Sequence, residues 1–196
     1  MPRAGLTRAS VVEAAAVLAD EVGLHSLTLA KLAERLGVKQ PSLYKHLDSL
    51  AGLHRSVSQL VKRELGQTFA RAAVGRSGAD AIRAIAHAYR DWALRHPGRY
   101  EAGLVMPSPG DVEDETIQRE TIQTIADVLT AYELDGDDAI DAIRAFRALM
   151  HGFVSLEISG GFAYKADINR SFDRLIHGFT VGLDRWTEPA DSHTVS

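Results

Sequence analysis

The sequence predicts an all-α protein of about nine helices. Apolar residues recur at helical spacing in one segment after another, and no stretch shows the alternating pattern of a half-buried strand. Glycine, proline and short acidic runs separate these segments, as expected of turns between helices. The chain has 196 residues, 45% hydrophobic and 24% charged, which suits one generous globular domain or two smaller ones that share a core.

The first two helices carry clear start and stop residues. The first is expected from about Thr7 to Val22, where Gly23 ends it, and its buried face is Val11, Ala15, Leu18 and Val22. Thr28 can cap the second helix with its side-chain oxygen. Gly37 can adopt the left-handed conformation that ends a helix. The apolar positions of this second helix are Leu29, Leu32, Ala33 and Leu36.

A third short helix follows, and its composition is unusual. Pro41 stands in its first turn, where a missing N–H is tolerated, and Leu43 and Leu47 give it only a narrow apolar stripe. The rest of its surface is polar and is made by Lys39, Gln40, Ser42, Tyr44, Lys45 and His46. A short, donor-rich helix braced by a longer neighbour is typical of a helix that lies in the major groove of DNA. A solvated surface helix in an ordinary bundle shows the same pattern, so the spacing alone leaves both readings open.

Six more helices are expected, over residues 48–73, 79–95, 99–104, 111–134, 137–158 and 168–186. We therefore expect a three-helix head in residues 1–47, a connecting helix in 48–73, a larger helical domain in 74–187 and a flexible tail in 188–196. The last two helices are apolar on more than one face, and such helices need more than one partner. A second copy of the chain is the simplest additional partner, so we expect a homodimer through a four-helix interface. Its predicted residues are Phe153, Leu156, Phe172, Leu175, Phe179 and Leu183.

Composition narrows the class of protein. The chain has no cysteine, which excludes disulfides and thiolate metal sites and fits a reducing, cytoplasmic environment. Acidic residues interrupt the N-terminal apolar stretch, and no apolar run is long enough to span a membrane, so neither a signal peptide nor a membrane partner is expected. Residues 1–63 hold nine Lys and Arg against five Asp and Glu, a net charge of +4, whereas the remainder carries −8. The basic excess thus lies on the segment that would meet phosphate.

Two segments resemble a known family. GLHSLTLAKLAERLGVKQPSLYKHLDSLAGL closely resembles the N-terminal DNA-binding segment of TetR-family transcriptional repressors, over roughly the first third of the chain. The C-terminal part resembles, more loosely, members with a His-Pro-Gly-x-Tyr segment and an aromatic-His-Gly signature. Those positions here are His96-Pro97-Gly98-Arg99-Tyr100 and Met150-His151-Gly152, with Met150 in place of the aromatic residue.

The resemblance implies which residues contact DNA. The contacts come from the helix that carries Pro41 and from the start of the preceding helix. Carried over by position, Thr28, Ser42, Tyr44 and His46 would hold phosphates, and Lys45 would lie close to the backbone or a base. Gln40 and Lys39 would face base edges, where Gln suits adenine and Lys suits guanine. Leu29-Ala30 stand where tetracycline-responsive members often carry an arginine, so the operator sequence does not carry over.

The resemblance also implies a repressor that binds a pseudo-palindromic operator as a dimer and is released by a small-molecule effector, with no cofactor. Candidate residues for the ligand pocket are Trp92, Tyr100, Met106, Phe146, Met150 and Phe162. Aromatic and methionine side chains at helical spacing are also the ordinary content of a core, so both readings stand.

The sequence also bears on two other classes of function, enzymes and architectural DNA-binding proteins. The chain has no HExxH motif, P-loop, nucleophile elbow or glycine-rich dinucleotide turn, so we expect no enzyme and no metal site. An architectural DNA-binding protein without a ligand would share the DNA-binding head but lack a cavity. A thermal-shift screen with small molecules would separate that class from a ligand-responsive regulator.

Overall fold

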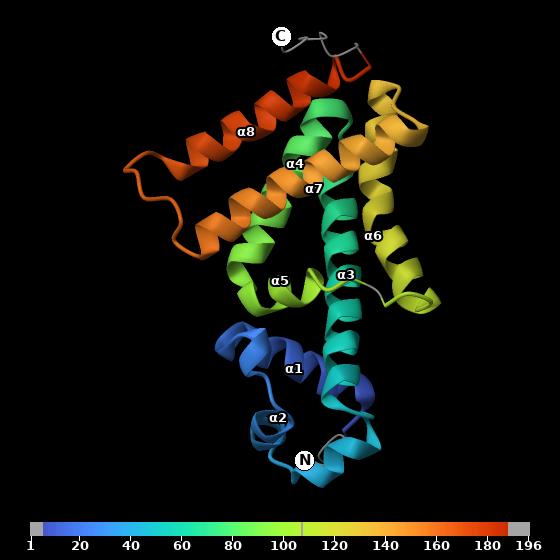
Figure 1. The fold of residues 1–196 in the computed structure, drawn as a ribbon, viewed down its shortest axis with the longest axis vertical. Coiled ribbons are helices and arrows are strands. Elements are labelled where there is room, and N and C mark those ends of the chain that lie inside the picture. Colours follow the sequence, from blue (N-terminus) through green and yellow to red (C-terminus); the bar gives the residue numbers. More distant parts are fainter. Residues whose placement is uncertain (1–5, 107, 188–196) are drawn as a thin grey trace, which may run out of the picture. The chain divides into compact units, whose positions relative to one another are not determined.

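The computed structural model describes residues 6–106 and 108–187, and in those ranges every regular element is helical (Figure 1). The predicted all-α fold is confirmed. The elements in chain order are α1 (Arg8–Val22), η1 (Leu24–Ser26), α2 (Leu29–Leu36), η2 (Gln40–Lys45), α3 (Leu50–Ala73), α4 (Gly78–Arg95), α5 (Pro97–Gly103), α6 (Val112–Leu129), η3 (Thr130–Tyr132), α7 (Gly136–Ile158) and α8 (Ile168–Leu183). Within this part of the chain, no helix is both long and apolar enough to cross a bilayer.

The predicted start and stop residues of the first two helices are confirmed. Thr7 caps α1 and forms a reciprocal pair of hydrogen bonds with Ser10, while Gly23 follows the last helical residue with φ of 81°. The Thr28 hydroxyl accepts a hydrogen bond from the backbone N–H of Lys31 at 3.3 Å. Gly37 has φ of 65°, the left-handed conformation that ends α2.

The third short helix differs from the prediction in its geometry. Residues 40–45 form the 3₁₀ helix η2, in which the N–H of Ser42 bonds the carbonyl of Lys39 at 2.8 Å and the N–H of His46 bonds that of Leu43 at 2.9 Å. Pro41 has no N–H to donate, and the segment is too short for a run of α-helical bonds to repay their nucleation. A 3₁₀ helix is a usual outcome for such a short piece.

Packing divides the chain into two compact units. The first unit comprises residues 1–67 and 91–122, and the second comprises residues 68–90 and 123–196. The helices α3, α4 and α6 each contribute residues to both units. These units follow packing, whereas the predicted ranges 1–47, 48–73, 74–187 and 188–196 follow expected roles, and that functional division stays a prediction. Residues 188–196, the predicted tail, lie outside the described part of the chain.

In the first unit, the His-Pro-Gly-Arg-Tyr segment holds the start of α5 against α1. The Asp20 carboxylate accepts the backbone N–H of Arg99 at 2.8 Å and faces the Nδ1 atom of His96 at 3.1 Å. The buried guanidinium of Arg99 also pairs with Glu64 on α3 at 2.8 Å and with Glu13 on α1 at 3.0 Å. The buried guanidinium of Arg99 therefore joins α5 to α1 and α3. The carboxylates around it compensate its positive charge.

The same contact explains why a glycine stands at position 98. A Cβ atom on Gly98 would lie 2.0 Å from the carbonyl oxygen of Ala19, so no side chain fits where α5 meets the end of α1. This segment is the His-Pro-Gly-x-Tyr segment that resembles a family motif. Its structural role is a close approach of two helices.

Ion pairs join α3 to the start of α6, also within the first unit. Lys62 Nζ lies 2.8 Å from Asp114 Oδ1, and both side chains are buried. Arg55 forms a bidentate pair with Asp111, and the hydrogen bonds from this guanidinium lower the pKa of Asp111 to about 2. These pairs bridge positions more than fifty residues apart, so they fix tertiary packing rather than local helix stability.

Candidate functional site

The polar surface predicted to meet DNA is exposed in the first unit. Leu43 and Leu47 are buried, so η2 is anchored along one side and its other side faces outward. Tyr44 is 53% exposed, an unusual state for a large aromatic residue with no interaction within the described chain. Of the predicted contacts, Thr28, Lys39, Gln40, Pro41, Tyr44 and Lys45 are exposed, and Ser42 and His46 are half-buried. We call these eight residues the η2 surface.

The turn between α2 and η2 fixes the direction of this surface. The N–H of Val38 bonds the carbonyl of Ala33 at 3.0 Å, and the N–H of Gly37 bonds that of Glu34 at 3.0 Å. With Gly37 in the left-handed conformation, the chain leaves α2 at a defined angle and half-buries Val38 before η2 begins. The structure therefore brings the predicted side chains together on a helix-turn-helix unit.

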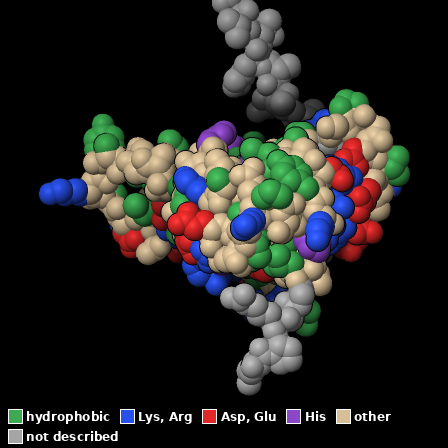
Figure 2. Space-filling view, turned by 90° about the horizontal axis from the view of Figure 1, so that it is seen from below, with side chains coloured by type: hydrophobic (Ala, Val, Ile, Leu, Met, Phe, Trp, Pro, Cys, Tyr) green, Lys and Arg blue, Asp and Glu red, His purple; other side chains and the backbone are tan. Residues whose placement is uncertain are grey.

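Charge on this end of the chain is mixed. Figure 2 shows the end that carries α2 and η2, where basic side chains stand beside acidic ones and no single sign covers the face. Arg35 on α2, for example, pairs with Glu21 on α1. The described basic side chains at this end are therefore interspersed with acidic ones.

The predicted dimer residues divide into two groups. Phe172, Phe179 and Leu183 belong to the core of the protomer, with 0%, 7% and 2% of their surface exposed. The α8 stripe that carries them packs on its own chain: Phe179 lies 5.5 Å from Phe146 and Phe172 lies 5.1 Å from Phe153, between ring centroids. These three side chains have little surface left for a partner. Phe153 and Leu175 are half-buried and Leu156 is 48% exposed, and the interface itself stays a prediction.

Another face of α7 and α8 is open. Val181 is 47% exposed, and a Cβ atom built on Gly152, Gly178 or Gly182 would meet no atom within 4 Å. Spacing analysis did not single out these residues, because glycine carries no hydrophobic weight in a periodicity count. The sequence signal that could have indicated this face is the pair Gly178 and Gly182, which stand four residues apart on α8.

The residues predicted to line one ligand pocket are divided between the two units, and the pocket they would form stays a prediction. Trp92 and Tyr100 are core residues of the first unit, and Met106 is 57% exposed. Phe146 and Met150 are core residues of the second unit. Their helical spacing reflects burial, which was the alternative reading of the same pattern. Phe162 alone among the six lines a cavity found in the second unit.

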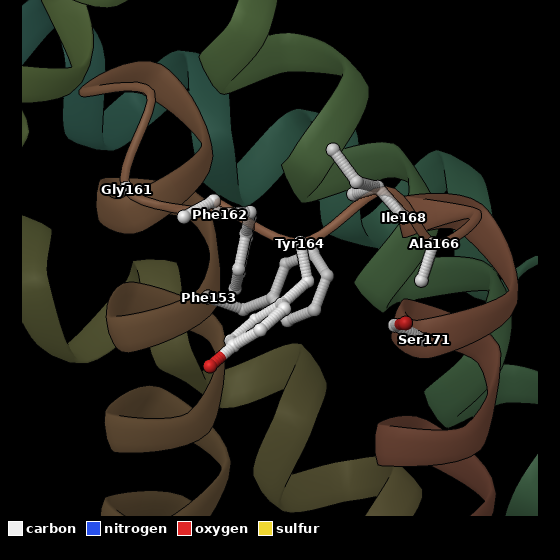
Figure 3. A pocket seen from close by; sticks show the side chains of 8 residues that line it. Phe153, Gly161, Phe162, Tyr164, Ala166, Ile168 and Ser171 are labelled. Atoms are coloured by element: carbon white, nitrogen blue, oxygen red, sulfur yellow. The ribbon is translucent and has the colours of Figure 1, made fainter.

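That cavity lies between the end of α7 and the start of α8 and has a volume of about 300 Å³. Figure 3 shows Phe153 on the α7 side, Ile168 and Ser171 on the α8 side, and the connecting loop with Tyr164 running across between them. Its lining residues are Phe153, Gly161, Phe162, Ala163, Tyr164, Ala166, Ile168 and Ser171. Most of them belong to an irregular loop, so no helical or strand periodicity could have indicated them.

Two histidines that could serve acid–base chemistry are each paired with a carboxylate. His87 faces Asp173 at 3.0 Å and His96 faces Asp20, each a pair within its unit. In residues 6–106 and 108–187, no group of three or more His, Asp and Glu side chains is placed to hold a metal ion.

Two family models and several known proteins match the chain. Residues 11–57 match the family model for bacterial regulatory proteins of the tetR family, and residues 82–179 match the tetracyclin repressor-like C-terminal domain. An uncharacterized HTH-type transcriptional regulator of Mycobacterium tuberculosis is 39% identical over 94% of this chain and 84% of its own length. One from Bacillus subtilis is 33% identical over 93% of this chain and 95% of its own length.

A solved structure agrees with these matches in fold. A protein of unknown function from Rhodococcus superposes with a TM-score of 0.78 at 21% identity, covering 93% of this chain and 98% of that one. The helix-turn-helix geometry, the exposed η2 surface, the two family models and the relatives that match along nearly the full length all agree. The chain belongs to the TetR family of bacterial transcriptional regulators.

Proposed function

We propose that the protein is a repressor that binds a pseudo-palindromic DNA operator as a homodimer and leaves it when a small molecule binds. The observation that carries this proposal is the η2 surface: a short polar element, anchored by buried Leu43 and Leu47, whose polar side chains are exposed except for the half-buried Ser42 and His46. A DNA-binding helix of this kind enters the major groove with its exposed side chains facing base edges.

Within the η2 surface, the position and the chemistry of each side chain indicate whether it contacts phosphate or a base. The Thr28 hydroxyl at the start of α2 and the Tyr44 hydroxyl on η2 are exposed and suit phosphate oxygens. Lys39 and Gln40 stand at the first turn of η2, which is the end that approaches base edges, and Lys45 lies in its last turn. Phosphate contacts set the position of the protein on the duplex, and the two base-facing residues select the sequence.

A dimer is needed because one η2 surface makes too few base contacts for selective binding, whereas two-fold symmetry doubles them. The open face of α7 and α8 supports this assembly. Leu156 and Val181 are about half exposed, and the bare surfaces of Gly152, Gly178 and Gly182 allow another helix to approach closely. A four-helix contact between two such faces would cover these residues.

Selection from random duplex DNA by the purified full-length protein, at two salt concentrations, tests the proposal. We expect enrichment of an inverted repeat whose half-sites lie about one helical turn apart. Recovery of unenriched DNA that is lost steeply as salt rises would show phosphate attraction alone and favour an architectural DNA-binding protein.

A further inference from the structure

The cavity between α7 and α8 is built to receive a ligand of a particular chemical class. We propose that it binds a small, uncharged aromatic molecule. The assignment of this cavity as the effector site of a repressor rests on the function proposed above. Binding of the ligand itself can be measured without DNA.

The mouth of the cavity is shaped by a tight turn at the end of α7. Gly160 has φ of 71°, and the N–H of Gly161 bonds the carbonyl of Leu156 at 2.7 Å. A Cβ atom on Gly161 would lie 2.9 Å from Leu156 Cδ2 and 3.2 Å from the Leu156 carbonyl oxygen, so the turn is tightly packed at this position. The chain then returns along α7, and the ring of Phe162 lies 4.8 Å from that of Phe153. These contacts hold the first part of the loop, Gly161 and Phe162, against α7.

A single buried arginine fixes both walls. Arg90 on α4 is 6% exposed and binds Glu157 on α7 through two hydrogen bonds, from Nε at 2.7 Å and from Nη2 at 2.6 Å. Its Nη1 donates to Asn169 on α8 at 2.9 Å. The guanidinium also lies over the rings of Phe172 and Phe153, at 4.9 Å and 5.7 Å from their centroids. The spacing of α7 and α8 around the cavity is therefore set from α4.

The lining chemistry selects an uncharged molecule. None of the lining side chains is charged at neutral pH, and the positive charge of Arg90 is already balanced by Glu157. A charged ligand would give up part of its hydration without gaining a partner among the lining side chains, and that weakens its binding. The Ser171 hydroxyl donates to the carbonyl of Asp167 at 3.1 Å and keeps its acceptor capacity, and Tyr164 brings the other side-chain hydroxyl of the lining, so the polar groups that its side chains offer a ligand are neutral.

The shape selects an aromatic molecule of modest size. Phe153, Phe162 and Tyr164 supply three aromatic rings to the lining, the Tyr164 ring from an exposed position, and stacked or edge-on contacts between rings add to the burial of apolar area. The volume of about 300 Å³ lies at the lower end of the range for ligand pockets. It suits a molecule of two or three rings.

Fluorescence titration with a matched pair of probes tests the inference. N-phenylnaphthylamine is neutral, and anilinonaphthalene sulfonate shares its ring system but carries a negative charge. We expect saturable binding of the neutral probe, one per chain, and binding of the anionic probe at least about tenfold weaker.

Variants locate the site. Ala166→Phe and Ala163→Phe each place a ring in the cavity from an exposed position and should weaken the neutral probe at least about tenfold. Ala131→Phe, at an exposed position of η3 outside the lining, is the control and should leave the affinity within about twofold. Circular dichroism melting of each variant establishes that it is folded.

Three results would overturn the inference: no saturable binding, equal affinity for the two probes, or equal binding by the folded cavity variants and the control. None of these readouts involves DNA. A protein that binds the neutral probe as expected but enriches no operator would contradict the proposed function and leave the ligand site standing.

Discussion

Gln40 and Lys45 stand at opposite ends of η2, and their side chains suit different parts of a DNA duplex. A glutamine amide donates and accepts, so it can read the edge of an adenine, whereas an ammonium is a mobile point charge suited to phosphate. The structure leaves both side chains exposed and without a hydrogen bond in the described chain, free to make those contacts.

Replacing Gln40 by Ala should therefore relax sequence preference. We expect a loss of about 1–3 kcal/mol on the selected operator and little change on a duplex altered at the base it reads. Lys45→Ala is the matched comparison: it should weaken all duplexes alike and flatten the salt dependence by about one unit. Fluorescence anisotropy at several salt concentrations measures both effects. Equal weakening on every sequence by Gln40→Ala would contradict its base-reading role.

His54 on α3 makes the first unit sensitive to pH. Burial, helped by the nearby His25, lowers the pKa of His54 below its ordinary value of 6.5, and its Nε2 atom is buried with no hydrogen-bond partner in the structure. The unfolded chain then binds a proton at this position more readily than the folded chain. Stability from neutral His54 is thus present above the unfolded pKa and is lost as pH falls from about 6.5 through the folded pKa.

We expect the melting temperature of the wild-type protein to fall between about pH 7.5 and 5.5 by more than that of His54→Leu, which cannot bind the proton. Differential scanning calorimetry across that range measures the difference. His177→Leu, at an exposed histidine of α8, serves as the control and should keep the wild-type dependence. Identical pH profiles for wild type and His54→Leu would contradict the role given to burial.

At the scale of helices, the buried pair Lys62–Asp114 decides how firmly α3 and α6 are joined. Each buried charge is stabilised by the other. A buried charge without a partner destabilises the folded state, whereas two apolar side chains packed in the same place do not. Lys62→Met should lower the free energy of unfolding by about 3–5 kcal/mol, since it leaves Asp114 buried alone.

The double variant Lys62→Met with Asp114→Leu removes both charges and should recover most of that loss. Urea unfolding followed by circular dichroism measures both variants. A double variant as unstable as Lys62→Met alone would show that the contact matters through shape rather than charge.

The ends of a helix could be predicted from the sequence where a single residue determines each end. Thr28 and Gly37 determine α2 through local hydrogen bonds and a left-handed φ, and both were readable from the chain. The geometry of η2 was not, because the choice between α and 3₁₀ bonding in six residues depends on how Leu43 and Leu47 are buried by the rest of the unit.

The cavity could not be predicted for a related reason. Its walls are set by Arg90, whose partners Glu157 and Asn169 stand 67 and 79 positions further along the chain. Its lining comes largely from residues 161–166, which have no periodicity. The apolar spacing of Phe146, Phe172 and Phe179 correctly indicated burial, but spacing alone does not say whether the partner is the same chain or a second copy.

For the whole molecule, assembly through α7 and α8 makes a prediction about oligomeric state. Leu156→Arg with Val181→Arg places two charges on the open face and should convert a dimer to a monomer at micromolar concentration, because an unpaired charge in an apolar interface is costly. Sedimentation velocity measures this. Ile140→Arg, which replaces a residue of α7 that is 46% exposed at another angle of the helix, should leave the dimer intact. Monomeric wild-type protein would rule out the proposed assembly.

The most direct test of the central claim changes the DNA rather than the protein. Once an inverted repeat has been selected, five base pairs are inserted between its half-sites, which rotates one half-site by about half a helical turn relative to the other. Two η2 surfaces held in one symmetric dimer can no longer meet both half-sites on one face, so affinity should fall at least about tenfold, toward that of a single half-site. Unchanged affinity for the lengthened operator would contradict a symmetric dimer that reads DNA through η2.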